Sequence, residues 1–462
     1  MKYIGPFLRL NSLNKENIES QLFYFSKESL NHIVFNSKCG LTIPGKELKQ
    51  KSYSDSEVNL LKSMYPILCV YKKANSKLKT TNDKLYWNDE KFKKEITVYS
   101  NAFMTLSLLE LCDYYSSFKE LDKSKYFFSD IYLNLSKKQL QFYATYLRNL
   151  DGVFVDKINS SDSIVGELKL EDKNKKFKFS NQSFMMSAFY KCSLKDNSKE
   201  SSNYKNFSLD ILNMFLQFRD ELYTLPLDEL LQLCMGLNIF YKYSQNEDCK
   251  NLMIDISELI IEKYSNNLDI LGERNLENKC LYYIDLFMLY ENTKILKYRD
   301  VYNKVYTEIL DSYNDELGIY IKPSEKDNLI FSATELSLYI LSVILHCKED
   351  KDDIHSRSIL TSVFKKQIID SGIILSWPDA PPLNDRERYR NFSLNSEDLL
   401  EEEFFKSQSL PTPESSEQAP IFIKNIKFSE KKQLFKQGKT SFYSNNNMFI
   451  FFLNIFLYNS YH

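Results

Sequence analysis

Several helices of this chain are predicted to be apolar around their whole circumference, and this property restricts the fold more than any other feature. The stretch Phe331 to Cys347, FSATELSLYILSVILHC, is the clearest example. Ser332 can accept a hydrogen bond from a backbone N–H of the first turn, as a helix N-cap does. The apolar residues from Leu336 to Leu345 cover nearly every side of the helix. Because such a helix has no polar side, it has to be buried on all sides.

Three other stretches open in the same way, which predicts an internal repeat. An aromatic residue, a serine and an asparagine stand before an apolar helix at Tyr99-Ser100-Asn101, Phe179-Ser180-Asn181 and Tyr443-Ser444-Asn445. Two further apolar segments complete the set. The sequence thus predicts six buried helices, at 102–115, from 180, at 228–243, at 279–291, from 332 and from 444.

Amphipathic helices are predicted to alternate with these buried ones. The clearest lies at 298–310, where apolar residues recur from Tyr298 to Leu310 at the i, i+3, i+4, i+7 and i+8 positions of a helix and form one stripe. The others are expected at 54–73, 130–148, 207–222, 248–264 and 354–370. A first helix at 14–33 is expected to stand outside the repeat.

The alternation of six buried helices with six half-buried ones resembles the (α/α)6 toroid, the closed ring of six helical hairpins in many carbohydrate-active enzymes. The resemblance covers residues 54–459 and concerns architecture only, because no motif of a particular family accompanies it. The predicted fold class is therefore all-α. We expect an N-terminal helix and lead-in at 1–53 and one toroid domain at 54–462, with insertions at 152–179 and 372–440 and short β pieces in the loops. An open solenoid of the same hairpins is the alternative.

Composition excludes several classes of partner. Sixty Lys and Arg residues against 62 Asp and Glu give a net charge of −2, without the basic excess of a nucleic-acid binder. The N-terminal sequence lacks a signal-peptide core, and the apolar run Met448–Tyr458 is too short to span a bilayer, so we expect a cytoplasmic protein without membrane contact. Eight widely spaced cysteines predict free thiols. No motif for a metal, nucleotide or other cofactor occurs, and none is expected.

In a closed ring, the links that enter the inner helices all lie on the face that holds the N-termini of those helices, and we call this face the rim. Toroid enzymes that the chain resembles use this face for substrate, and helix N-termini favour anionic groups. Cleavage of a glycosidic bond takes two carboxyls about 5–10 Å apart. We therefore predict catalytic roles for Asp156, Glu335 and Asp379, with Asp156 or Glu335 paired with Asp379. The helix dipole alone also favours an acid in a first turn, such as Glu335.

Other acidic residues are expected on the rim: Asp162, Glu167, Glu273, Glu277, Asp385 and Glu387. The sequence Trp377-Pro378-Asp379 predicts a substrate-binding loop, since a Trp beside a carboxylate can stack on a sugar ring. Arg386 and Arg388 are predicted to bind a carboxylate or phosphate of the substrate. The alternatives are a packed loop corner for Trp377, and ion pairs with the acidic run 401–403 for the arginines.

The resemblance to toroid enzymes, taken with these residues, implies a protein that binds an oligosaccharide or a sugar acid at the rim. Hydrolysis or elimination of a glycosidic bond is the reaction that its carboxylates would perform. The competing hypothesis is a non-catalytic helical scaffold that binds another protein through its concave surface or through 378–420. The two hypotheses differ in the ring centre. An enzyme is expected to place buried carboxylates there, whereas a scaffold is expected to fill it with Tyr and Phe.

Overall fold

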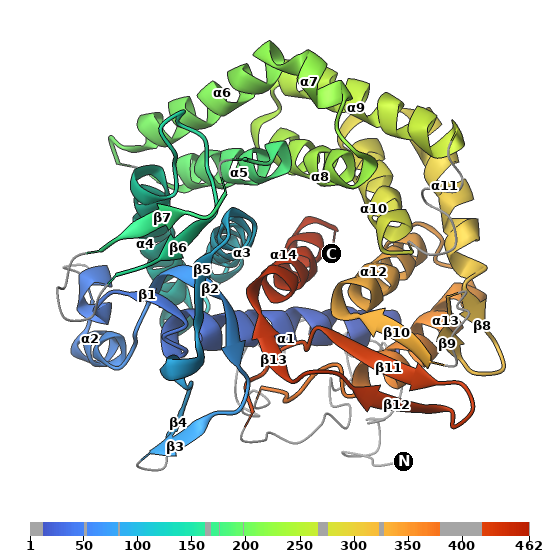
Figure 1. Ribbon diagram of the computed structural model, residues 1–462, viewed down its shortest axis with the longest axis horizontal. Coiled ribbons are helices and arrows are strands. Elements are labelled where there is room, and N and C mark those ends of the chain that lie inside the picture. The colour runs from blue at the N-terminus through green and yellow to red at the C-terminus, as the bar shows by residue number, and fades with distance from the viewer. Residues whose placement is uncertain are drawn as a thin grey trace.

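The chain folds into a ring of helical hairpins, seen along its axis in Figure 1. The computed structural model describes residues 13–49, 53–81, 84–161, 168–174, 176–196, 198–266, 276–322, 328–378 and 418–461. Within these ranges, six apolar helices form the inner ring: α3 (Val98–Ser116), α5 (Phe179–Lys195), α8 (Leu227–Ser244), α10 (Leu276–Thr293), α12 (Ala333–Glu349) and α14 (Ser444–Tyr461). Each packs against the next in chain order, and α14 packs against both α12 and α3. This closure confirms the predicted toroid and excludes the open solenoid.

Amphipathic helices form the outer layer. Five of them pack against the inner helix that precedes them: α4 (Lys123–Tyr146), α6 (Ser201–Gln217), α9 (Glu247–Asn266), α11 (Leu296–Leu310) and α13 (Ile354–Val363), which continues into a π-helical turn at Phe364–Ile369. A short helix, α7 (Arg219–Tyr223), follows α6. The sixth outer helix is α1 (Lys15–Asn36), which packs on α14. The expectation that the first helix stands outside the repeat was therefore wrong.

The predicted helix at 54–73 was also wrong. Its start is as expected, because Ser54 and Glu57 form a capping box, but α2 ends at Lys62 after eight residues (Asp55–Lys62). Pro66 lacks a backbone N–H and disfavours helical backbone at the residue before it. The chain continues instead as β2 (Ile67–Asn75), so the place of the outer helix falls to α1.

Short antiparallel strands occupy the links. One sheet has the order β1-β2-β5-β6-β7, with β13 also paired to β2, and a second has the order β10-β11-β12. The other strands of the first sheet are β1 (Gly40–Thr42), β5 (Lys93–Ile96), β6 (Lys157–Asn159), β7 (Leu170–Asp172) and β13 (Ser441–Tyr443), and the second sheet consists of β10 (Asn328–Ser332), β11 (Asn425–Ser429) and β12 (Leu434–Gln437). There are two separate hairpins, β3 (Lys79–Thr81) with β4 (Lys84–Tyr86) and β8 (Tyr313–Asn314) with β9 (Ile319–Tyr320). Short 3-10 turns lie at Gly45–Leu48 and Asp89–Lys91. Because β5, β10 and β13 run into α3, α12 and α14, the two sheets lie on the rim.

The repeated Ser of the helix openings does not have one repeated role. Ser332 is the N-cap of α12, but the N-cap of α3 is Thr97, and the residue before α5, Lys178, makes no side-chain cap. Three of the four helices, α3, α5 and α14, share a carboxamide in the first turn. Asn101, Gln182 and Asn447 each bind both the N–H and the C=O of one residue in a link: Val70, Phe154 and Phe422, respectively. These clamps fasten the links to the inner helices.

All eight cysteines are free and buried, as predicted. Among the described helices, none combines the length and the apolar character that a membrane span requires.

Candidate functional site

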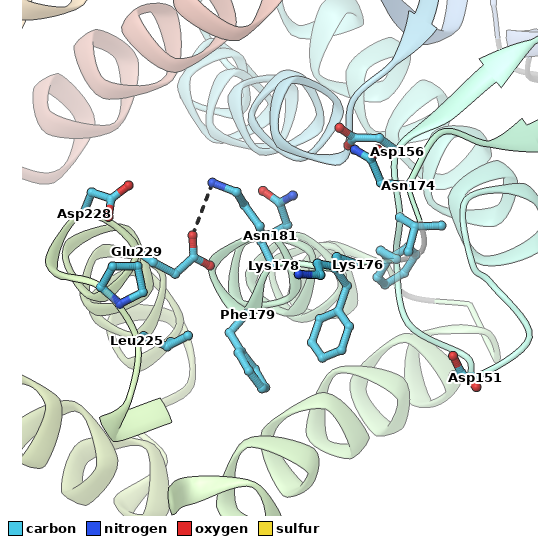
Figure 2. Close-up of a pocket in the computed structure, with 14 residues that line it drawn as sticks. Asp151, Asp156, Asn174, Lys176, Lys178, Phe179, Asn181, Leu225, Asp228 and Glu229 are labelled. Carbon is cyan, nitrogen blue, oxygen red and sulfur yellow. Dashed lines mark ion pairs between the residues drawn. The ribbon is translucent and has the colours of Figure 1, made fainter. Parts of the chain in front are cut away.

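A pocket of about 860 Å³ opens on the rim where α5 and α8 begin (Figure 2). Its lining comes from the links before α5 and α8 and from the first turns of these two helices. The lining residues are Asp151, Phe154, Val155, Asp156, Asn174, Lys176, Phe177, Lys178, Phe179, Asn181, Leu225, Pro226, Asp228 and Glu229. Sugar-sized ligands fit a volume of this order.

Asp156, a predicted catalytic residue, lies in the wall of this pocket. Its carboxylate accepts a hydrogen bond of 2.9 Å from the backbone N–H of Val98, the first residue of α3. Burial raises the pKa of Asp156, while the Val98 N–H and the charges of Lys173 and Lys72 act in the opposite direction. With its pKa raised, Asp156 stays protonated to a higher pH than an exposed aspartate does.

Glu229 faces the same pocket and was not predicted. It is the third residue of α8 and is 6% exposed. Its carboxylate accepts hydrogen bonds from the backbone N–H (2.9 Å) and hydroxyl (2.8 Å) of Ser180 in α5, and it pairs with Lys178 at 3.4 Å. The sequence contained a signal, because an acid follows Pro226 in the first turn of an apolar helix, but the predicted set of rim acids omitted this link.

Asn181 and Phe177 supply the other groups that a ligand needs. Asn181 is 8% exposed, and among the described residues its side-chain oxygen has no hydrogen-bond partner. A buried carbonyl oxygen without a partner is costly in the free protein, and a ligand donor would satisfy it. Phe177 is 37% exposed and is held edge-on against Phe179, with ring centroids 5.0 Å apart. The pocket thus combines an exposed aromatic ring with an unused hydrogen-bond acceptor.

The clamp on Phe154 positions the wall that carries Asp156. Gln182 donates to the Phe154 carbonyl at 2.9 Å and accepts from its N–H at 3.0 Å, and both residues are about 1% exposed. We expect Gln182→Leu to lower the free energy of unfolding by about 2–4 kcal/mol, because it leaves two buried backbone groups unpaired. Urea denaturation measures this loss. The exposed Gln217→Leu is the matched control and should change stability by less than about 0.5 kcal/mol; an equally small effect of Gln182→Leu would contradict the role of the clamp.

Glu335 lies on the rim at the start of α12. It closes a capping box with Ser332 and pairs with Lys322 at 2.9 Å. Glu277, near the start of α10, accepts a hydrogen bond of 3.1 Å from the Ser332 hydroxyl. Burial raises the pKa of Glu277, and the negative charge of Glu335 adds to this effect. Tyr99 of α3 is partly buried, and the charges of Glu277 and Glu229 add to the effect of desolvation in raising its pKa.

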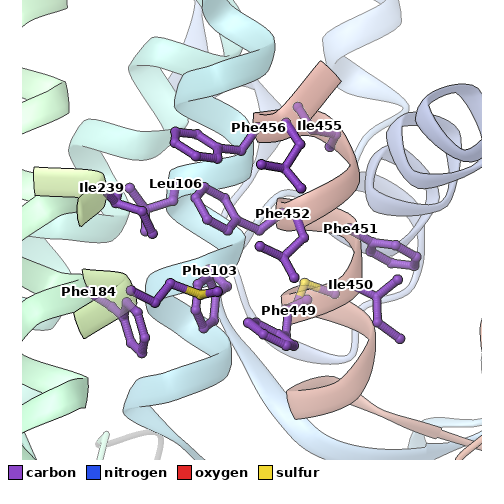
Figure 3. Close-up of a cluster of buried hydrophobic side chains, with 14 of the residues drawn as sticks. Phe103, Leu106, Phe184, Ile239, Phe449, Ile450, Phe451, Phe452, Ile455 and Phe456 are labelled. Atoms are coloured by element: carbon purple, nitrogen blue, oxygen red, sulfur yellow. The ribbon is translucent and has the colours of Figure 1, made fainter. Parts of the chain in front are cut away.

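The ring centre beneath these groups is filled with aromatic side chains (Figure 3). Phe103 of α3 is fully buried, and its ring centroid lies 4.4 Å from that of Phe184 and 5.1 Å from those of Phe449 and Phe452. Phe456 continues the stack along α14 at 5.1 Å from Phe452. The candidate site lies off the ring axis, at the starts of α5 and α8.

Two predicted site residues that the structure describes, Glu335 and Trp377, do not line this pocket. Asp379, Arg386 and Arg388 lie outside the described residues, as does most of 378–420. Trp377 is 4% exposed, and its ring packs edge-on against that of Phe25 in α1, with ring centroids 5.1 Å apart. Its ring is therefore part of the hydrophobic core that packs against α1. This placement matches the packed loop corner better than a stacking platform. Asp156 and Glu335 stand at the starts of α3 and α12, with α14 between them.

Comparison with known proteins gives no family. No protein-family model and no curated protein sequence matches the chain. Solved structures of similar shape include a D-mannose isomerase (10% identity, 78% of this chain and 86% of that chain, TM-score 0.44) and a GH76 α-mannanase of Bacteroides thetaiotaomicron (12%, 83% and 91%, 0.42). A cellulase of C. cellulolyticium in complex with cellobiose is also similar (10%, 96% and 98%, 0.41). At these identities and TM-scores, the likeness supports no conclusion about the reaction of this chain.

Across the described part of the chain, no three His, Cys, Asp or Glu side chains gather in a way that could hold a metal ion. The polar side chains that line the pocket carry carboxyl groups, ammonium groups and the carboxamides of Asn174 and Asn181.

Proposed function

We propose that the rim pocket binds a carbohydrate, either a neutral oligosaccharide or a sugar acid. Sugars present hydroxyl groups on their edges and C–H groups on their faces, and they are bound by polar groups beside an aromatic ring. The observation that carries the proposal is the unpartnered carboxamide oxygen of Asn181 in the same pocket as the exposed ring of Phe177. Lys176 and Lys178 add cationic groups for the carboxylate of a sugar acid.

Cleavage of a glycosidic bond is the reaction that we propose for this pocket. Asp156 would act as the general acid, since its raised pKa favours the protonated form that donates to the leaving oxygen. Glu229 would act as the second carboxylate, held in place by Ser180 and Lys178. Glu335, which does not line this pocket, and Asp379, which lies outside the described residues, are kept as candidate carboxylates elsewhere on the rim.

A thermal-shift screen against oligosaccharides and sugar acids tests the proposal, because a ligand of the native state raises Tm by mass action. For a ligand found in this way, we expect Phe177→Ala and Asn181→Ala each to weaken binding about tenfold in calorimetry, which corresponds to about 1.4 kcal/mol. Phe218, exposed at the end of α6, provides the control: Phe218→Ala should bind as the wild type does. The proposed function would be ruled out if no member of the panel changed Tm, or if Phe177→Ala and Asn181→Ala both bound the ligand as tightly as the wild type does.

The scaffold hypothesis is kept as a second candidate because of one observation, the aromatic filling of the ring centre around Phe103. A scaffold of this kind would bind a protein partner through its surface or through 378–420. It predicts a Tm that does not respond to any member of the sugar panel.

A further inference from the structure

Residues 424–439, which we call the basic hairpin, form a strongly charged surface. They comprise β11, the turn and β12, and they contain six lysines and one glutamate, a net charge of +5 in a chain whose overall net charge is −2. All six lysines are exposed: Lys424, Lys427, Lys431, Lys432, Lys436 and Lys439. The charge of this segment is thus opposite to that of the rest of the molecule.

The strand register concentrates this charge. Lys427 and Lys436 are direct partners across β11 and β12, and both point to solvent. Like charges at opposed positions of a sheet are destabilising. Among the described residues, neither lysine forms an ion pair that would offset this repulsion. An anionic ligand laid across the strands would offset it.

The charged surface continues to the rim. Lys424 and Lys73 both lie over the ring of Tyr443, at 5.8 and 5.0 Å from its centroid, immediately before α14 begins. The sheet of the basic hairpin includes β10, whose last residue, Ser332, is the N-cap of α12. The pocket opens at the N-terminal ends of α5 and α8. The basic hairpin is attached to the N-terminal ends of α12 and α14, so it lies on the same face of the ring. In the ribbon view, β11 and β12 lie across the ring from α5 and α8 (Figure 1).

We propose that the basic hairpin binds the acidic groups of a polyanionic glycan, part of which occupies the rim pocket. This inference rests on the proposed function, which it narrows from carbohydrates in general to chains that carry uronic acid or sulfate groups. The lysines supply attraction that depends on ionic strength, and the pocket, with Phe177 and Asn181, supplies recognition of the sugar ring. A glycan is favoured over other polyanions because the basic surface and the pocket share one face.

Calorimetry of the full chain with a long oligogalacturonate tests the inference at low and moderate salt. We expect Lys427→Gln/Lys436→Gln to weaken binding about tenfold at 50 mM NaCl, with a smaller loss between 50 and 200 mM NaCl than the wild type shows. The matched control is Lys205→Gln/Lys365→Gln, which removes two exposed lysines of the outer layer and should leave binding within about twofold. Phe177→Ala should also weaken the binding of the oligogalacturonate.

The variants separate the two claims. Weakening by Phe177→Ala but not by Lys427→Gln/Lys436→Gln would overturn the role of the basic hairpin and leave the proposed function standing. Weakening by the lysine variant alone would show a polyanion surface without a sugar pocket and would overturn both. Tighter binding of phosphatidylserine vesicles or single-stranded DNA, lost in the lysine variant, would assign the surface to lipid or nucleic acid and would also overturn the inference.

Discussion

Phe103→Ala is expected to lower the free energy of unfolding by about 3–5 kcal/mol. Phe103 is fully buried at the centre of the ring, where it touches rings from α3 itself, α5 and α14 (Figure 3). Truncation removes the transfer free energy of the ring and leaves a cavity that three rigid helices cannot fill. Because the contact between α14 and α3 closes the ring, the truncation weakens the packing between the two ends of the repeat.

Urea denaturation followed by circular dichroism measures this change. Phe218→Ala, which truncates a phenylalanine that is 45% exposed, should alter stability by less than about 0.5 kcal/mol. A loss below about 1 kcal/mol for Phe103→Ala would mean that the centre of the ring is not packed as described.

Asp285→Leu is expected to stabilise the protein by about 2–4 kcal/mol at pH 8. Asp285, in the middle of α10, is 2% exposed, and neither of its carboxyl oxygens has a hydrogen-bond partner among the described residues. Burial raises its pKa well above the usual range, so the folded protein holds the carboxyl protonated at a pH where the unfolded chain releases the proton. Leucine has a similar size and carries no polar atom.

The advantage of Asp285→Leu should depend on pH in a defined direction. Below about pH 4, Asp285 is neutral in both states and titration adds no penalty. As pH rises above that value, the unfolded state loses its proton first, so the wild type loses stability relative to the variant until the folded carboxyl also ionises. Differences in Tm measured from pH 4 to pH 8 should therefore widen with pH. A constant difference, or a destabilised variant at pH 8, would contradict this description of Asp285.

The inner ring was predictable because it depends on local composition. Segments such as Leu336–Leu345 are apolar on every side, and burial is the only way to stabilise them, whatever the partners are. The packing of α1 on α14 was not predictable in the same way, because the two helices lie more than 400 residues apart in the sequence. The apolar stripe of α1 shows that one side of the helix is buried, but it does not show which helix covers that side. Pro66 is a local signal in the sequence against a helix that continues to residue 73.

Some residues of the candidate site were also predictable from the sequence, and others were not. Asp156 was placed on the rim by the order of helices and links, and it lines the pocket. Glu229 was not predicted because the predicted rim acids belong to the longer links, whereas the link before α8 is short. Asn181 belongs to the repeated helix opening, but that its oxygen lacks a partner depends on how the neighbouring helices pack, which sequence does not reveal. Trp377 was predicted to stack on a sugar because it lies close to a carboxylate in the sequence, but its ring packs against Phe25.

The crystal structure of the protein with the tightest ligand of the sugar panel tests the central claim most directly. A sugar ring should stack on Phe177, with a hydroxyl group within hydrogen-bonding distance of the Asn181 side-chain oxygen. A ligand that saturates the protein in solution but is bound elsewhere in the crystal, with the rim pocket holding only solvent, would contradict the account.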